Sequence, residues 1–475
     1  MAPPSAAAAK KPAPQTVVAL IDTGINPYSP AFRDASPLAR RHPSTYLPGY
    51  PKDALALKLT LGVPYDEAIE RDAAVWKAVR PDKLYWIPGT RIVGAISMGD
   101  GGTSCPSPVQ VPPVAAFVQE DCPDTNILDD HGHGTMTASR AAGSPSSLAP
   151  STRIVAIEGL GAGSVEWAAE QGWIDVQSNS WINLVPPPIP GGTTEAFSAA
   201  AARMLTLAAS GNGTAYLAGG APTPTYLLST APPGVVLVGG HDNGKATLWS
   251  GSPPHVVADA YAGMTAIARS VEEMRPDPIA CCTSAASPYA AGGAVALIAE
   301  ARRLLGSDFT GVRDGLVACG RGGVVPKGPL ADGAFTLEEL KDLFLHTAEA
   351  LPSEGRDDGD VHWAGGPRPP DHIEFGPGAN PFCVGCTTTP VAWKSLPAAA
   401  DAYALVGYGG INEHSVEAGF AVLRGEQEMP SRPQADAQYD ADQELRETVF
   451  AANTLSESPA PGSCPPPPIP VAPAR

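Results

Sequence analysis

Three short patterns in the sequence place side chains that could carry out acyl transfer. Asp22 lies in LIDTG, His133 in DHGHGT and Ser284 in TSAASP. Acyl transfer requires a hydroxyl that attacks a carbonyl, an imidazole that accepts the hydroxyl proton, and a carboxylate that holds the imidazole in the right tautomer. We therefore take Asp22, His133 and Ser284 as candidate catalytic residues.

A developing oxyanion needs hydrogen-bond donors beside the hydroxyl. Asn212 lies in the glycine turn SGNG, directly after an apolar run, and is our candidate side-chain donor. Ser284 precedes an Ala-rich helical pattern at residues 287–305, whose positive dipole end would favour a nucleophile there. Pro288 is expected in the first turn of this helix, where backbone N–H groups have no helical partner.

Strand and helix patterns alternate around these residues. Continuous apolar runs are typical of strands buried on both faces, and the helical stretches are Ala-rich or amphipathic. The expected strands lie at residues 16–21, 153–157, 234–238 and in part of 200–209, and the expected helices at 136–142, 164–171, 287–305 and 337–350. This order predicts an α/β fold with a doubly wound parallel sheet, helices on both faces, and a site at the carboxyl ends of the strands.

The candidate carboxylate and imidazole are 111 residues apart in a chain of 475 residues. A Pro- and Gly-rich segment at about 34–125 accounts for this separation, and we interpret it as a large insertion between the first strand and the His-bearing helix. The other expected divisions are a disordered tail at 1–15, one domain at 16–425, a C-terminal extension at 426–455 and a Pro-rich disordered tail at 456–475.

Composition excludes some classes of function. The net charge of −18 disfavours nucleic acids and anionic lipids as partners. No apolar run is long enough for a membrane span, and residues 1–15 show no apolar segment of signal-peptide length. The eight cysteines would form up to four disulfides in an oxidising compartment and would be free thiols in the cytosol, and the sequence leaves both open.

The motifs in this order resemble those of the subtilase family of serine peptidases. The chain order Asp, His, Ser with DTG, GHGT and TSxASP is similar to the family pattern. Further matches are LAP before residues 153–158, DVQSNSW at 175–181, residues 205–213, and GYGGIN at 407–412. The resemblance spans about residues 16–425 without the insertion.

This resemblance implies a role for each matching residue. Asp22 would orient the imidazole, His133 would act as general base and then acid, Ser284 would attack, and Asn212 would donate to the oxyanion together with the backbone N–H of Ser284. Cys282 departs from the pattern, because the family usually has Gly there. A side chain at this position could crowd the oxyanion site.

The resemblance also implies substrate-binding residues. Ser180, Trp181 and Ile182 would face Ala209, Ser210 and Gly211 across the primary specificity pocket. Gly161, Ala162 and Gly163, with the following Ser164, would form an edge strand that pairs with the substrate backbone. Trp181 fits the core equally well.

Several features have alternative interpretations. DTG also marks aspartic proteases, but no second copy is present. His131 and His133 could belong to a metal site, although Thr135 stands where a dinuclear hydrolase has Asp. His131 is more simply a local structural residue.

Metal binding elsewhere has weak support in the sequence. The CxxC of Cys383 and Cys386 lacks a second pair, so we expect disulfides or a local loop there, and Cys105 could pair with Cys122. The acidic run at 357–360 resembles a calcium loop in composition only. We assign no metal-ligating residues and require no cofactor, while structural calcium remains open because subtilases often bind it.

The resemblance implies a serine endopeptidase that acts on polypeptides, and we expect a monomer. Together with the eight cysteines it predicts a secreted protein, while the net charge and the lack of a long apolar run predict neither nucleic-acid binding nor membrane insertion. One alternative is a catalytically impaired subtilase scaffold used for binding. Another is a peptidase that processes one specific partner. The first would not react with a serine-directed probe, and the second would cleave few substrates.

Overall fold

The computed structural model describes most of the chain between Gln15 and Phe450, together with Cys464. The described residues are 15–98, 127–129, 131–143, 147–181, 192–211, 231–242, 245–246, 254–260, 283–307, 309–320, 327–351, 407–450 and 464. The tails predicted at 1–15 and 456–475 therefore lie outside the described residues, except for Gln15 and Cys464.

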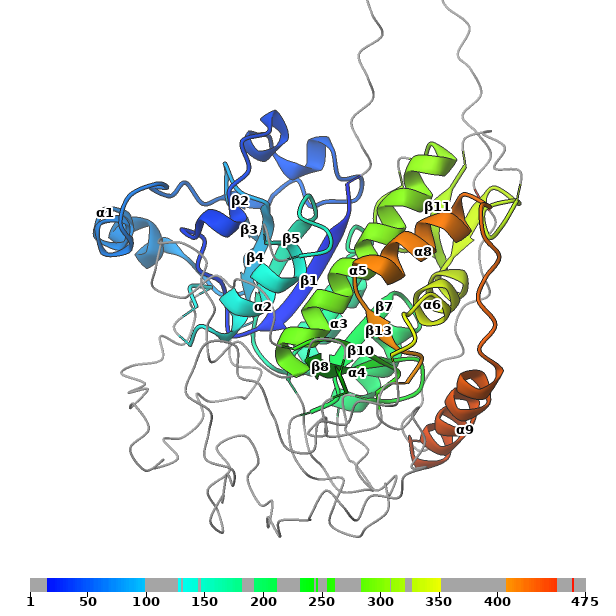
Figure 1. The fold of residues 1–475 in the computed structure, drawn as a ribbon. Coiled ribbons are helices and arrows are strands. Elements are labelled where there is room, and N and C mark those ends of the chain that lie inside the picture. The colour runs from blue at the N-terminus through cyan, green and yellow to red at the C-terminus, as the bar shows by residue number, and fades with distance from the viewer. Residues whose placement is uncertain are drawn as a thin grey trace, which may run out of the picture.

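A mostly parallel sheet forms the centre of the molecule (Figure 1). Its strands run in the order β13-β10-β8-β7-β6-β1-β5-β4-β3-β2, and β9 pairs with β8. The strands are β1 (Val17–Asp22), β2 (Leu55–Ala56), β3 (Tyr85–Trp86), β4 (Ile92–Ser97), β5 (Arg153–Glu158), β6 (Val176–Asn179), β7 (Leu205–Ala209), β8 (Val236–Asp242), β9 (Lys245–Ala246), β10 (Val256–Asp259) and β13 (Gly410–Ile411). Among the described strands of this sheet, only the β3–β4 and β8–β9 pairings are antiparallel.

The apolar runs form the predicted central strands because both faces of the sheet are covered. Every residue of β1 is buried, and so are all of β7 and all but the last of β5. β8 begins at Val236, two residues later than predicted, because Gly234 is in a turn with a φ of +85°. The predicted doubly wound α/β fold is confirmed.

Helices cover both faces of the sheet. α2 (His133–Ala142) and α5 (Thr283–Leu305) pack against each other and against the central strands, while α3 (Ala162–Glu170) and α4 (Thr193–Ala201) pair on the opposite face (Figure 1). α6 (Leu337–His346) and α8 (Glu413–Leu423) pack outside α5. A small antiparallel pair, β11 (Leu316–Cys319) and β12 (Ala334–Thr336), also lies beside α5 and α6.

The segment predicted as a peripheral insertion contributes to the main sheet, and this corrects the sequence-based interpretation. Within it, β4 pairs in parallel with β5 and is fully buried, and β3 and β2 extend the sheet to one edge. The run Ile92–Ser97 was not recognised as a core strand because the Pro- and Gly-rich residues around it dominate the composition. α1 (Tyr65–Ala78) projects beyond this edge, and residues 99–126 lie outside the described part.

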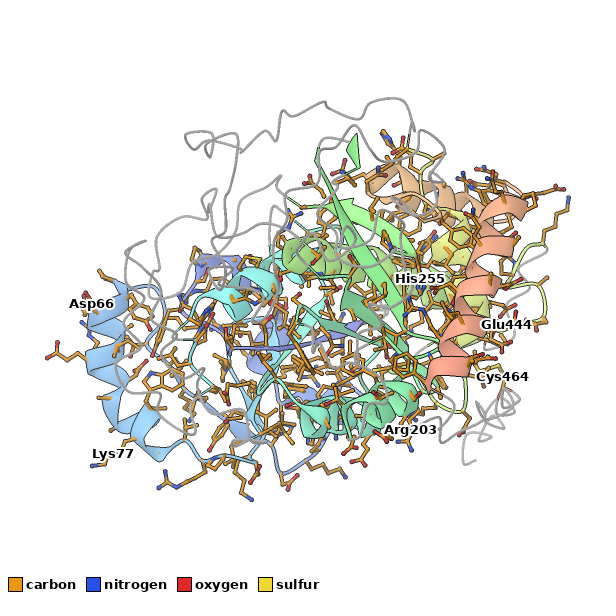
Figure 2. All side chains as sticks on the ribbon, turned by 90° about the horizontal axis from the view of Figure 1, so that it is seen from below. Asp66, Lys77, Arg203, His255, Glu444 and Cys464 are labelled. Atoms are coloured by element: carbon orange, nitrogen blue, oxygen red, sulfur yellow. A yellow bond between two sulfur atoms is a disulfide. The ribbon has the colours of Figure 1, made fainter. Side chains whose placement is uncertain are left out.

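A further helix, α9 (Pro433–Phe450), accounts for most of the predicted C-terminal extension. Figure 2 shows α9, which carries Glu444, beside the strand end at His255. Beyond it, Cys464 forms a disulfide with Cys319 of β11. None of the helices in the described residues combines the length and apolarity needed to cross a membrane.

Candidate active site

Asp22 ends β1 at the carboxyl edge of the sheet, where sequence analysis placed it. The side chain is almost fully buried, and its carboxylate accepts hydrogen bonds from two neighbours besides the histidine. The Thr23 N–H donates to Oδ1 over 2.8 Å, and the Thr137 hydroxyl donates to Oδ2 over 3.2 Å. These bonds fix the orientation of the carboxylate toward the start of α2.

His133 is the first residue of α2 and lies against Asp22. Gly132 precedes it with a φ of +99°, a left-handed conformation that glycine adopts without a steric penalty, and this turn starts the helix. The His133 Nδ1 lies 2.7 Å from Asp22 Oδ1. In neutral histidine this contact places the proton on Nδ1 and leaves Nε2 as an acceptor.

The electrostatic environment favours the charged form of His133. Burial of the imidazole lowers its pKa, but the charge and hydrogen bond of Asp22 and the charge of Asp129 outweigh burial, so the pKa is raised above 6.5. The side chain is nevertheless 21% exposed, so it remains accessible from solvent. An accessible imidazole held by a carboxylate can accept a proton from a neighbouring hydroxyl.

Ser284 is the second residue of α5, and its hydroxyl does not bond to the histidine in this structure. The Ser284 hydroxyl donates to the Ser180 carbonyl over 3.1 Å, and the Ser180 hydroxyl donates to the Ser284 carbonyl over 2.9 Å. The packing of α5 against α2 places Ser284 and His133 on adjoining helices. A hydrogen bond between a catalytic hydroxyl and its base often forms only once substrate is bound.

Pro288 explains why Ser180 holds the backbone of Ser284. In an α-helix the N–H of residue 288 would donate to the carbonyl of Ser284, but proline has no N–H. The Ser180 hydroxyl takes this place. The expectation that Pro288 lies in the first turn is wrong, because α5 begins at Thr283 rather than Ser287.

Asp129 is a buried carboxylate that sequence analysis did not identify. It is fully buried between the Asp22 turn and the first turn of α2, and it accepts hydrogen bonds from Thr23, His131, Gly132 and Thr135. A carboxylate two residues before HGHG, directly after the apolar Ile127 and Leu128, was the available signal. The backbone N–H of His131 bonds to it, which supports a structural role for His131.

The residues predicted to form the specificity pocket lie at adjacent strand ends. Asn179 of β6 pairs with Ala208 of β7, so Ser180 and Trp181 follow one strand where Ala209, Ser210 and Gly211 continue the next. The Trp181 ring packs edge-on against Phe197, 5.5 Å between centroids, and this contact is with the core. Ser180 and Ser210 are buried, whereas Ile182 and the candidate donor Asn212 lie outside the described residues.

The predicted edge strand at Gly161, Ala162 and Gly163 is wrong. β5 ends at Glu158, Gly159 turns the chain with a φ of +125°, and α3 begins at Ala162. Gly161 is extended, but only as the residue that precedes the helix. Because α3 begins at Ala162, too few residues remain between β5 and α3 to form a strand that could pair with a substrate.

Most of the cysteines and the acidic run considered in the sequence analysis are not described by the structure. Cys282, Cys281, Cys383, Cys386, Cys105, Cys122 and the acidic run at 357–360 all lie outside the described residues. Within the part of the chain that is described, no three His, Cys, Asp or Glu side chains cluster in a way that could hold a metal ion. The disulfide between Cys319 and Cys464 had no specific sequence signal.

Comparisons with known proteins identify relatives of this arrangement. The sequence model of the subtilase family matches residues 14–363. No curated protein matches the chain. The solved structures that it resembles include the prenylagaramide maturation protease PagA, at 15% identity and a TM-score of 0.32, covering 62% of this chain and 84% of that one.

Two more structures give similar values. The epidermin leader peptide processing serine protease (EpiP) from Staphylococcus aureus is 16% identical with a TM-score of 0.35, covering 61% of this chain and 66% of that one. The PatG macrocyclase in complex with peptide is 13% identical with a TM-score of 0.33, covering 70% of this chain and 92% of that one.

Proposed function

The chain belongs to the subtilase family and is a serine endopeptidase, and we propose that it cleaves peptide bonds with Asp22, His133 and Ser284 as its catalytic triad. The observation that carries this assignment is the 2.7 Å contact between Asp22 Oδ1 and His133 Nδ1 at the carboxyl edge of the sheet. Ser284 supports it from the adjoining helix, since α5 packs on α2.

The proposed reaction begins with proton transfer to His133 Nε2. The Ser284 oxygen attacks the carbonyl carbon of the substrate while its proton passes to the imidazole, and a tetrahedral intermediate forms. The imidazolium then protonates the leaving amine, and the acyl-enzyme remains on Ser284. Water attacks this ester with the same histidine as base, which releases the acid and restores the hydroxyl.

Before attack, the Ser284 hydroxyl must leave the Ser180 carbonyl. A change of the Ser284 χ1 rotamer would break this single hydrogen bond of 3.1 Å. The carbonyl of Ser284 stays bonded to the Ser180 hydroxyl, so the helix start remains in place. The free energy of the lost bond is on the order of 1 kcal/mol, a modest barrier to activation.

We assign the oxyanion donors from the family resemblance. Asn212 and the backbone N–H of Ser284 would bind the oxyanion of the tetrahedral intermediate, and the positive end of the α5 dipole supports negative charge there. Ser180, Ser210 and Gly211 are proposed to line the pocket for the side chain that precedes the scissile bond. The proposed chemistry uses side chains and water, without a cofactor.

The proposed substrate is an extended polypeptide, and the proposed setting is an oxidising compartment outside the cell. The disulfide between Cys319 and Cys464 supports this setting, because disulfides persist where thiols are not kept reduced. The net charge of −18 supports the absence of a nucleic-acid partner. We propose a monomer as the active form.

A serine-directed fluorophosphonate probe tests the assignment. Wild type should be labelled and should cleave a denatured protein substrate, whereas Ser284→Ala should do neither. Ser287→Ala is the matched control, because Ser287 lies in the same helix and its hydroxyl bonds to Ser178. It should keep both properties.

The labelling and cleavage results distinguish the nucleophile, the triad and the breadth of specificity. Label that persists in Ser284→Ala would show that Ser284 is not the nucleophile. A wild-type protein that folds but neither labels nor cleaves would overturn the proposed triad and favour a binding scaffold. Cleavage of few sequences in a proteome-derived peptide mixture would indicate a specific processing peptidase.

A further inference from the structure

The buried carboxylate of Asp129 joins the two motifs that carry Asp22 and His133. Its Oδ1 accepts hydrogen bonds from the Thr23 hydroxyl (2.9 Å) and the backbone N–H groups of His131 (3.1 Å) and Gly132 (2.7 Å). Its Oδ2 accepts from the N–H (2.7 Å) and hydroxyl (2.5 Å) of Thr135. One side chain thus binds residues on both sides of the Asp22–His133 pair.

Two threonines extend these bonds into the backbone. The Thr23 hydroxyl, which donates to Asp129, accepts from the Gly134 N–H over 2.9 Å. The Thr135 hydroxyl, which also donates to Asp129, accepts from the Asn26 N–H over 2.9 Å. The turn after Asp22 and the first turn of α2 are therefore linked twice through a single carboxylate.

Two glycines allow these segments to approach closely. A Cβ on Gly134 would lie 2.2 Å from the Gly24 carbonyl oxygen, and a Cβ on Gly24 would lie 2.9 Å from the Ile127 carbonyl oxygen. Both distances are too short for a real side chain. The backbones of the two motifs are therefore in direct contact, and Asp129 is hydrogen-bonded to residues of both.

Asp129 also acts on His133 through its charge. The titratable side chains that the structure places against the imidazole are Asp22 on β1, Asp129, and His131, whose ring centroid lies 6.1 Å away. Asp129 has no ion-pair partner among the described residues, and its charge is balanced only by hydrogen-bond donors. Its field therefore reaches the imidazole without an intervening cation, and it raises the pKa of His133 together with Asp22.

We propose that Asp129 is a positioning residue for peptide hydrolysis, which holds His133 against Asp22 through Thr23 and Thr135 and adds a second negative charge beside the imidazole. This inference rests on the proposed triad. The proposed role requires no contact between Asp129 and the substrate, because Asp129 is fully buried.

The test compares Asp129→Asn with wild type in the pH dependence of kcat/KM, with active sites counted by fluorophosphonate labelling. The amide has nearly the same shape, but it carries no charge and places an NH2 group against N–H and O–H donors. We expect kcat per active site to fall about 100-fold, the effect of a misplacement of about 1 Å, with a smaller change in KM. The acid limb of the profile should move to lower pH, because the imidazole loses one negative neighbour.

Asp72→Asn is the matched control. Asp72 is also buried and accepts hydrogen bonds from the Tyr28 hydroxyl and from the N–H and hydroxyl of Thr60, at the edge of the molecule formed by α1. Its loss should lower the melting temperature without moving the acid limb. If Asp129→Asn behaves in the same way, the positioning role is refuted and Asp129 is purely structural.

A second pair of variants keeps the inference testable if Asp129→Asn does not fold. Thr23→Val removes only the hydroxyl that bonds to Asp129 and Gly134, and it should lower kcat at least about tenfold. Thr23→Ser keeps the hydroxyl and should restore activity. Equal activity of the two variants would overturn the inference, whereas a wild type without labelling would refute the triad itself.

Discussion

At the scale of single residues, the state of Ser284 depends on a proline one turn further along the helix. Pro288 cannot donate to the Ser284 carbonyl, so the Ser180 hydroxyl does, and the Ser284 hydroxyl returns a hydrogen bond to the Ser180 carbonyl. The same pair of bonds connects the end of β6 to the start of α5. A residue proposed for the specificity pocket therefore also sets the resting position of the proposed nucleophile.

The raised pKa of His133 gives a prediction for the wild-type enzyme. The general base must be neutral, and the charges of Asp22 and Asp129 outweigh burial and hold the proton on the imidazole to a higher pH than usual. We expect kcat/KM to fall as the pH drops through a midpoint above 6.5. A pH series with a neutral peptide substrate measures it, and a midpoint below 6.5 would contradict this account of the electrostatics.

At the scale of elements, helix starts and strand ends meet at the carboxyl edge of the sheet. α2 begins with His133 and α5 begins one residue before Ser284, so both proposed catalytic side chains are held by first turns. α9 is attached by aromatic contacts of Tyr439 and also by polar groups. The His255 Nδ1 accepts from the Leu237 N–H over 3.1 Å, and its Nε2 lies 2.9 Å from the Asp442 carboxylate of α9.

A buried charge makes this attachment testable. Arg446 is almost fully buried and donates to Asp442 and to the Ala231 carbonyl. Asp442→Asn leaves this cation without its carboxylate, so we expect the free energy of unfolding to fall by about 3 kcal/mol in urea denaturation. Asp440→Asn, at an exposed position of the same helix, should change it by less than about 0.5 kcal/mol. Equal effects would show that α9 is not held by this pair.

At the scale of the whole molecule, a disulfide closes the C-terminal third of the chain. Cys319 and Cys464 are 145 residues apart, and the loop between them contains α6, α8 and α9. A crosslink across so long a loop restricts the unfolded chain strongly. It joins the end of the chain to β11, which packs on α5, the helix of the proposed nucleophile.

Removal of the disulfide should destabilise the enzyme without changing its site. Cys464→Ser should lower the free energy of unfolding by about 2–5 kcal/mol, while kcat per active site stays at the wild-type value. A reductant should lower the melting temperature of the wild type toward that of the variant. A count of eight free thiols in the denatured wild type would contradict both the disulfide and the proposed oxidising compartment.

Local patterns were sufficient to predict the strands β1, β5, β7 and β8 and the helices α2, α3, α5 and α6. Runs such as residues 16–21 and 153–157 are apolar enough to be buried on both faces, and the Ala-rich run at 287–305 forms most of α5. The order of the Asp, His and Ser motifs, with the strand ends that carry them, was sufficient to identify the family and the candidate triad. Burial pattern and motif order are properties of short segments, so the sequence by itself determines them.

The tertiary structure decided what depends on contacts between distant segments. Asp129 lies 106 residues from Thr23, and its place before HGHG did not show which hydrogen-bond donors would surround it. β4 became a core strand through its pairing with β5, and the supposed edge strand at Gly161 became a helix start because the connection from β5 is short. A buried charge or an extra strand is stabilised by neighbours that only the folded chain brings together, so a local pattern can suggest the residue or the run but not the partners that give it its role.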